Sequence, residues 1–111
     1  MQPETKSRIE RILGSHRVVL SMKGTRDFPQ CGFSAHVVQV LEEHGAEYEA
    51  VNVLEEPELR RGLKEYSDWP TFPQLYVDRR LVGGCDIVTE LADSGEIGLL
   101  LSGEAEARLP A

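Results

Sequence analysis

The segment Val18–Met22 constrains the fold of this chain more than any other part of the sequence. Its residues are apolar except for one serine, and Lys23-Gly24-Thr25 ends the run. An apolar strand without polar alternation is typical of a sheet that is covered on both faces. We therefore expect a central strand here, with helices packed against the sheet that contains it.

The remaining periodic segments predict further strands and the helices. Helical spacing of apolar residues indicates helices around residues 9–13, 34–45, 57–66, 86–95 and 96–101, and β-rich runs indicate strands over 48–53, Gln74–Val77 and 80–82. Gly14 stands where the first helix should end, and Asp86 stands where an N-cap belongs. Asp78 and Arg79 join the last two strands. They predict a hairpin; because Arg79 disfavours the positive φ of a tight two-residue turn, a looser turn is the alternative there.

The order of these elements, α-β-α-β-α-β-β-α, gives a parallel pair of strands joined by a crossover helix, plus an antiparallel hairpin. The predicted fold class is therefore α/β, with a small four-stranded mixed sheet flanked by helices, as in the thioredoxin-like arrangement. With 111 residues, of which 41% are hydrophobic, the chain has the size and apolar content of one domain. We expect a single domain over residues 1–111, with a flexible tail from about 103 to 111.

Charge and hydropathy argue against several classes of function. The net charge of −7 disfavours binding to nucleic acid, and no apolar run is long enough to cross a membrane. The first residues carry neither an apolar signal core nor an Arg-rich transit segment, so we expect a cytoplasmic protein. In that compartment two distant cysteines, Cys31 and Cys85, suggest reactive or ligand thiols more than a structural disulfide. The three histidines make no close pair with either cysteine, so the spacing of a zinc site is absent.

Cys31 is the residue that most favours chemistry. The motif Cys31-Gly32-Phe33-Ser34 lies between a strand end and a helix start, where backbone N–H groups and the positive helix end stabilise a thiolate. Lys23, at the end of the preceding strand, adds positive charge near the thiol. The alternative interpretation is that Cys31 is a buried, inert cysteine. Ser34 stands where a redox C-x-x-C motif has its second cysteine, so no local disulfide can form. Cys31 therefore needs a thiol from another molecule or a metal as its partner. The only candidate within the chain is the distant Cys85.

The segment before the third strand favours a bound peptide-like ligand. A Thr-x-Pro placement beside a thiol suits a cis peptide at Pro73, and the backbone at Phe72 would then offer a donor and an acceptor to an extended ligand. The alternative is an ordinary trans entry into the strand. Lys23, Arg60 and Lys64 can supply positive charge for a carboxylate, although solvated surface cations are the default interpretation.

The start of the helix at 86–95 suits an amino-acid head group. In Gly83-Gly84-Cys85-Asp86, free N–H groups at the helix start can hold a carboxylate, while Asp86 can meet an ammonium group. The alternatives are a plain N-cap for Asp86 and a small, packed apolar residue for Cys85.

Four motifs follow one another along the chain: Lys23-Gly24-Thr25, Pro29-x-Cys31-Gly32-Phe33-Ser34, Trp69-Pro70-Thr71-Phe72-Pro73-Gln74-Leu75 and Gly83-Gly84-Cys85-Asp86. Together they strongly resemble the monothiol glutaredoxins of the C-G-F-S class, and the similarity covers about residues 9 to 101. Four matches in the right order are far more specific than any one of them.

The resemblance implies a thioredoxin-like fold, glutathione as cofactor and a labile [2Fe-2S] cluster bridged between two protomers. Each protomer would give one thiolate, from Cys31 as the catalytic residue and metal ligand, and two glutathione thiols would complete the four sulfur ligands. By position, the residues that would contact glutathione are Lys23, Arg60, Phe72, Cys85 and Asp86, the last two at its γ-glutamyl end. The resemblance also implies iron–sulfur cluster assembly, transfer or storage, with BolA-like proteins and apo iron–sulfur proteins as partners.

Two classes of function use these same residues. In the first, the protein is a cluster carrier in which Cys31 is a ligand without turnover. In the second, it is an oxidoreductase that removes glutathione from mixed disulfides through the Cys31 thiolate. We favour the carrier, because the long loop over residues 25–30 is expected to misplace a second glutathione. A third hypothesis is an adaptor that binds partners without metal.

Overall fold

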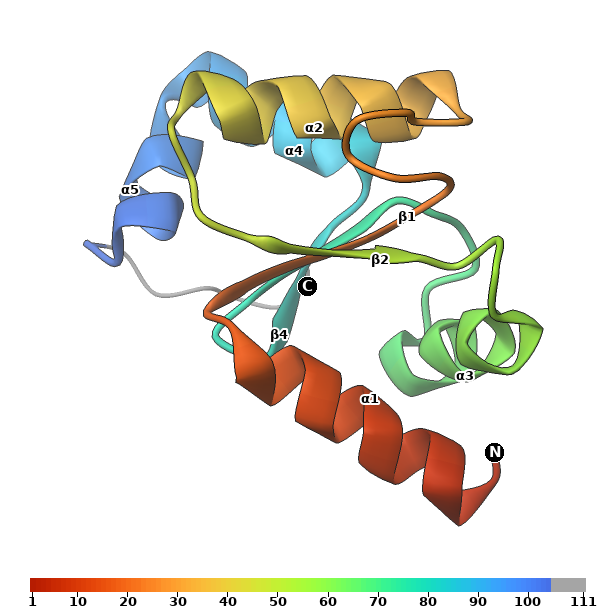
Figure 1. The fold of residues 1–111 in the computed structure, drawn as a ribbon. Coiled ribbons are helices and arrows are strands. Elements are labelled where there is room, and N and C mark those ends of the chain that lie inside the picture. The colour runs from red at the N-terminus through yellow and green to blue at the C-terminus, as the bar shows by residue number, and fades with distance from the viewer. Residues whose placement is uncertain (105–111) are drawn as a thin grey trace.

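The computed structural model describes residues 1–104, and these form five helices and four strands (Figure 1). The helices are α1 (Pro3–Ser15), α2 (Gly32–Glu43), α3 (Pro57–Ser67), α4 (Cys85–Ser94) and α5 (Glu96–Ser102). The strands are β1 (Val18–Met22), β2 (Glu49–Asn52), β3 (Gln74–Val77) and β4 (Arg80–Gly83). The predicted order of elements is confirmed, while the predicted flexible tail lies, from residue 105 on, outside the described residues.

The four strands form one mixed sheet in the order β2-β1-β3-β4. β1 pairs in parallel with β2, through the crossover helix α2, and antiparallel with β3, which continues into the β3–β4 hairpin. Ser21 pairs with Gln74, and Leu75 pairs with Gly83. The end of β1, the start of β3 and the end of β4 therefore lie at one edge of the sheet, and this edge carries the candidate site.

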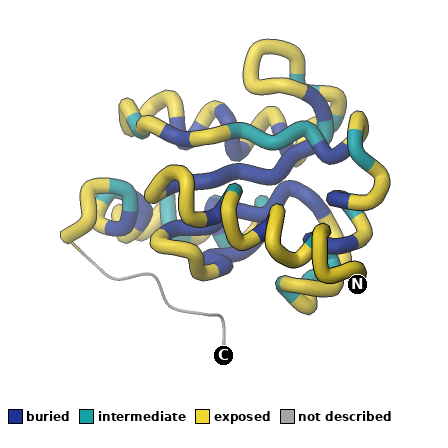
Figure 2. The backbone as a smooth tube through the Cα atoms, turned by 60° about the horizontal axis from the view of Figure 1, so that its bottom comes forward, coloured by how far each residue is buried: buried dark blue, intermediate teal, exposed yellow. Residues whose placement is uncertain are grey.

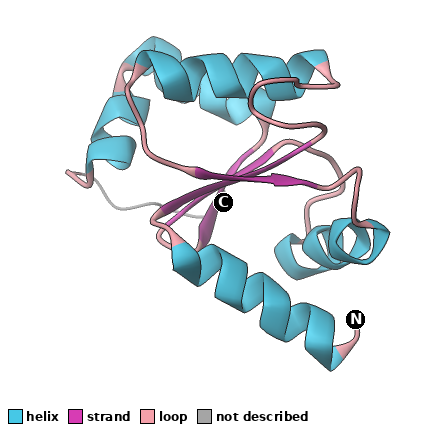
Figure 3. Cartoon of the chain, viewed as in Figure 1, coloured by secondary structure: helices cyan, strands magenta, loops and turns pink. Residues whose placement is uncertain are grey.

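Helices cover both faces of the sheet, as the apolar run of β1 predicts (Figures 1 and 3). Side chains alternate across a strand, so Leu20 and Met22 pack with α2, α4 and α5, whereas Val19 packs with α1 and α3. All of β1 is buried, and Figure 2 shows the buried backbone running through the middle of the molecule between exposed helix faces. No helix in the described range is both long and apolar enough to span a membrane.

At the far end of the sheet one local prediction is wrong, and one alternative is not adopted. Gly14 does not end the first helix, which continues to Ser15; a Cβ at this position would lie 2.6 Å from a guanidinium nitrogen of Arg79, so the glycine allows a close approach. The β3–β4 turn is tight, with positive φ at both Asp78 and Arg79. Contacts from Arg17 stabilise it, because its carbonyl accepts the Asp78 N–H at 2.8 Å and its Nε lies 3.0 Å from the Asp78 carboxylate.

Candidate functional site

Cys31 is the N-cap residue of α2, one position before the helix begins. Its backbone is extended and its side chain is only partly buried. The pKa of the Cys31 thiol is lowered, foremost by hydrogen bonding from the backbone N–H of Ser34 and then of Phe33, with a contribution from the charge of Lys23; burial opposes this shift. The predicted stabilisation of a thiolate at the helix start is therefore confirmed in direction, and the alternative of a buried, inert cysteine does not hold.

Ser34 connects the thiol to the end of β1. Its side chain is fully buried, and its Oγ accepts a hydrogen bond from the Lys23 N–H at 3.2 Å. The same hydroxyl also helps to lower the pKa of Cys31. The residue in the place of a second redox cysteine thus fixes the geometry of the first one.

The loop between β1 and Cys31 is closed by its own backbone. Gly24 and Pro29 form an isolated antiparallel bridge, and the Gln30 N–H donates to the Lys23 carbonyl at 2.9 Å. Gly24 has a φ of +98°, and a Cβ there would lie 2.6 Å from the backbone of both Phe28 and Gln30. Only glycine suits this position, which makes Gly24 a structural requirement of the loop.

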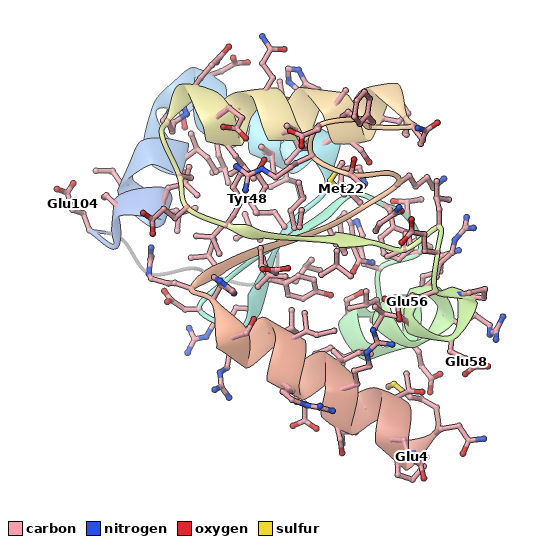
Figure 4. All side chains as sticks on the ribbon, viewed as in Figure 1. Glu4, Met22, Tyr48, Glu56, Glu58 and Glu104 are labelled. Atoms are coloured by element: carbon pink, nitrogen blue, oxygen red, sulfur yellow. The ribbon has the colours of Figure 1, made fainter. Side chains whose placement is uncertain are left out.

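The tip of the same loop is held by an ion pair that sequence reasoning missed. Arg26 Nη2 lies 2.7 Å from Glu42 Oε1, its guanidinium stacks 4.0 Å from the centre of the Tyr48 ring, and the Tyr48 hydroxyl donates to the same Glu42 oxygen at 3.0 Å. We call these three residues the Arg26 latch. The pKa of Glu42 is lowered by its bonds to Arg26 and Tyr48, and burial raises the pKa of Tyr48 to about 12. Tyr48 lies under α2, between the helix and the sheet (Figure 4).

Hydrogen bonds from the side chain of Gln74 hold the loop before β3. This fully buried side chain donates from Nε2 to the carbonyls of Trp69 and Thr71 at 3.1 and 3.3 Å, and its Oε1 accepts the Tyr76 hydroxyl at 2.8 Å. Of the two alternatives that the sequence left open at Pro73, the structure has the cis peptide bond. Sequence reasoning gave Gln74 no role, although a polar residue opening an apolar strand was a visible signal.

The start of α4 differs from the prediction. Gly84 is the N-cap, and Asp86 is the second residue of the helix, exposed and without a capping hydrogen bond. Cys85, the first residue, packs partly against the core on the α2 side. A Cβ at Gly84 would lie 3.2 Å from the Pro73 carbonyl oxygen, so the start of α4 abuts the cis-proline loop. A side chain at this N-cap position would need the cis-proline loop to shift by a few tenths of an ångström.

Unpaired cations surround this edge of the sheet. Among the described residues, Lys23, Arg60 and Lys64 have no salt-bridge partner. Lys64 lies 5.9 Å from the centre of the Phe72 ring, and Arg60 lies one turn earlier on the same face of α3. Arg60 Nε and Trp69 Nε1 are buried without a hydrogen-bond partner. The site therefore offers free positive charge and unsatisfied donors, which suit a carboxylate-bearing ligand.

The sheet edge brings together most of the predicted site residues. Lys23 and Cys31 follow β1, Phe72 precedes β3, and Cys85 and Asp86 follow β4. Arg60 lies on α3, one turn before the lysine that faces the Phe72 ring. No group of three metal-ligating side chains occurs within residues 1–104. A metal centre at Cys31 would therefore need ligands from outside the described chain.

Comparisons with known proteins agree with this geometry. A family model described as Glutaredoxin matches residues 18–82. The chain is 54% identical over 97 residues to monothiol glutaredoxin-S7, chloroplastic, of Oryza sativa subsp. japonica, covering 87% of this chain and 58% of the relative. It is 50% identical over 113 residues to monothiol glutaredoxin-5, mitochondrial, of Saccharomyces cerevisiae, covering 99% and 75%. The chain thus spans little more than half the length of the rice relative.

Solved structures show the same fold. Reduced poplar apo GrxS14 matches with a TM-score of 0.78 and 55% identity, over 88% of this chain and 90% of that one. Reduced glutaredoxin C1 from Populus tremula x tremuloides matches with a TM-score of 0.80 and 28% identity, over 97% and 92%. The predicted thioredoxin-like fold with a four-stranded mixed sheet is confirmed.

Proposed function

The chain belongs to the glutaredoxin family, in its monothiol class, and we propose that it binds glutathione and carries a labile [2Fe-2S] cluster between two copies of itself. The observation that carries this proposal is the partly exposed Cys31 thiol, whose pKa is lowered at a helix start where Ser34 replaces a second cysteine. Such a thiol is a good soft ligand, and it has no neighbour in its own motif with which to form a disulfide.

The surroundings of Cys31 suit glutathione, a tripeptide with two carboxylates and one ammonium group. Lys23 and Arg60 are free to pair with a carboxylate, and the buried Arg60 Nε still needs an acceptor. We assign the γ-glutamyl end to the start of α4, where the first amides face a carboxylate and Asp86 faces the ammonium group. In this assignment the backbone at Phe72 pairs with the central peptide, and Cys85 contacts the γ-glutamyl end.

The donor set suits a cluster shared between two chains. A [2Fe-2S] centre takes four sulfur ligands, and Cys31 would supply one per protomer. Two glutathione thiols complete the set, since residues 1–104 contain no three-ligand metal site. When bound, the cluster is cargo, and we propose that it is passed to apo iron–sulfur proteins, with a BolA-like protein as a further partner.

A second candidate function is supported by the same lowered pKa of Cys31. In glutathione-dependent reduction, the Cys31 thiolate attacks the glutathione sulfur of a mixed disulfide, and the other protein leaves as its thiolate. A second glutathione thiolate then attacks the Cys31 mixed disulfide, which releases oxidised glutathione and restores Cys31. The Arg26 latch holds the tip of the loop against α2, so the loop has little freedom to move aside for that second glutathione. We therefore keep the cluster carrier as the main proposal.

Anaerobic reconstitution with iron, sulfide and glutathione tests the carrier. We expect a coloured holo form that runs as a dimer on gel filtration, falls to monomer when iron is chelated, and fails to form without a small thiol. A stable monomeric holo form, or one without bound thiol, would contradict the shared cluster. A protein that stays colourless would favour the adaptor hypothesis, and glutathione-dependent turnover without colour would favour the oxidoreductase.

The cellular setting remains part of the proposal. We propose a cytoplasmic protein without nucleic-acid or membrane partners, and the net charge of −7 supports the exclusion of nucleic acid. The rice and yeast relatives are named chloroplastic and mitochondrial. Immunodetection in fractionated source cells decides between these compartments.

A further inference from the structure

Two phenylalanines beside the site face solvent. Phe28 is 74% exposed and Phe33 is 64% exposed, more than any other large hydrophobic residue in the described range. Neither contributes to either core cluster. Scattered single apolar residues at a surface are ordinary, but two large aromatic side chains beside one reactive thiol call for a physical account.

Both aromatic residues lie close to Cys31. Phe28 is three residues before it and Phe33 two residues after it, so their Cα atoms lie within about 11 Å and about 7 Å of the Cys31 Cα. Phe33 stands in the first turn of α2, on a rigid element. The two exposed rings therefore belong to the same small region of the surface as the partly exposed Cys31 thiol.

Phe28 is exposed although its backbone is held firmly. Its N–H donates to the Thr25 carbonyl at 3.1 Å, its carbonyl accepts the Thr25 N–H at 3.3 Å, and the neighbouring Pro29 bridges Gly24. At the turn between Thr25 and Phe28, the Arg26 latch fixes the loop to α2. The loop thus presents the ring in one place, which lowers the entropy lost on contact with a partner.

We propose that Phe28 and Phe33 form the apolar surface on which a second copy of this chain docks around Cys31, and that Arg26 is a positioning residue that holds Phe28 for this contact. The inference rests on the proposed function, because a cluster with one protein thiolate per chain leaves the site incomplete without a second copy. A twofold arrangement brings the same patch from both copies to the one cluster.

The area of the patch defines what it can do. With ~200 Å² for each ring, the exposed fractions of 74% and 64% amount to roughly 550 Å² over two copies. Stable protein–protein interfaces bury at least ~1,200 Å². The aromatic surface therefore cannot hold the chain as a dimer without the cluster, but it strengthens the dimer once the cluster is bound.

Serine substitutions test the contact directly. Holo protein of Phe28→Ser and Phe33→Ser is diluted serially, and its dimer content is measured by sedimentation with detection of the cluster absorbance. We expect each change to raise the dissociation constant of the dimer about tenfold, as for a truncated aromatic anchor. Leu99→Ser, at an exposed apolar residue of α5, is the matched control and should leave it unchanged. Glutathione affinity of the apo protein, measured by calorimetry, should stay at the wild-type value in all three variants.

Arg26→Ala tests the positioning role, with Arg61→Ala as control because Arg61 makes an exposed ion pair of the same 2.7 Å length with Glu58. We expect Arg26→Ala to weaken the holo dimer about threefold, consistent with the modest energy of an exposed cation–π and ion pair. Arg26→Lys should restore only part of the wild-type dimer affinity, since a lysine cannot present the planar guanidinium. Arg61→Ala should change nothing in the dimer.

The outcomes separate the two proposals. A wild-type chain that takes up no cluster would overturn the proposed function and this inference together. A normal holo dimer whose dissociation is unchanged in both phenylalanine variants would overturn only the docking surface. Loosening by the phenylalanine variants, with an Arg26→Ala dimer as tight as wild type, would keep the surface and remove the role of Arg26.

Discussion

The starts of α2 and α4 resemble each other, yet they build different sites. Each has a partly buried cysteine at a helix start, but Cys31 is the N-cap of its helix, whereas Cys85 is already the first helical residue. Three residues further on, α2 has the buried hydroxyl of Ser34 and α4 has the buried apolar side chain of Val88. At Cys31 the N-cap position and the hydroxyl of Ser34 accompany a lowered pKa of the thiol, whereas Cys85 packs partly against the core on the α2 side. The two helix starts therefore place their cysteines in different surroundings.

The largest test of this difference exchanges each cysteine for serine. Cys31→Ser should abolish cluster uptake, because it removes the one protein ligand, whereas Cys85→Ser should retain most of it. The measurement is the visible absorption after anaerobic reconstitution with glutathione. A coloured Cys31→Ser protein would show that the ligand has been assigned to the wrong helix start.

The second test removes the hydroxyl that distinguishes the two helix starts. In a Cys85→Ser background, Ser34→Ala should raise the pKa of Cys31 and move the pH profile of its alkylation to higher pH, because the thiolate loses one of its hydrogen bonds. The shift should be partial, since the backbone N–H of residue 34, the main cause of the lowered pKa, remains. The Lys23 N–H also loses its acceptor, so the free energy of unfolding should fall by about 1–2 kcal/mol.

The matched control for this change is Ser21→Ala. Ser21 is also buried, and its hydroxyl donates to the Gln74 carbonyl at 3.2 Å. Ser21→Ala should lower the free energy of unfolding by a similar amount, measured by thermal or urea denaturation. It should leave the pH profile of Cys31 alkylation unchanged. If both variants shifted the profile equally, general loosening of the site would explain the effect, and the Ser34 hydroxyl would have no special role.

The smallest expected effect concerns the α4 start. Asp86→Asn keeps the size of the side chain and removes its charge. Because Asp86 is exposed, its ion pair with the ligand would be solvated and contribute at most ~1 kcal/mol. We therefore expect glutathione to bind at most about fivefold more weakly. Glu96→Gln, an exposed acid in the first turn of α5, provides the same change of charge at a helix start outside the site. Calorimetry on both apo variants measures the glutathione affinity. If Asp86→Asn binds glutathione as tightly as the wild type, Asp86 has no role in binding it.

Local sequence patterns predicted those parts of the fold that depend on near neighbours. The run of β1 indicated burial on both faces, and the strand-to-helix junction placed Cys31 at a helix start, where the pKa of its thiol is lowered. The Thr-x-Pro spacing indicated the cis bond before Pro73 as one of two alternatives. At Cys31 and Pro73 the deciding residues lie within a few positions of the motif, and for β1 the apolar composition of the strand itself carries the signal.

The errors and omissions come from contacts between distant segments. The tight turn at Arg79 is held by Arg17, and the N-cap of α4, Gly84, lies close to the backbone of Pro73. The Arg26 latch joins the loop to two residues that are 16 and 22 positions away. No periodicity or motif within one segment reports such pairs, so the sequence predicted which residues carry the chemistry but not what holds them in place.

The pairing of β1 with β3 also has a consequence for the newly made chain. Residues 18–21 pair with residues 74–77, so the second of the two partners of the central strand is added by the ribosome more than fifty residues later. Such non-local pairing closes late in folding. Cys31 therefore leaves the ribosome well before residues 72–86, which complete its surroundings, have been added. During that interval it is open to oxidation and to stray metal ions, and it depends on the reducing capacity of its compartment.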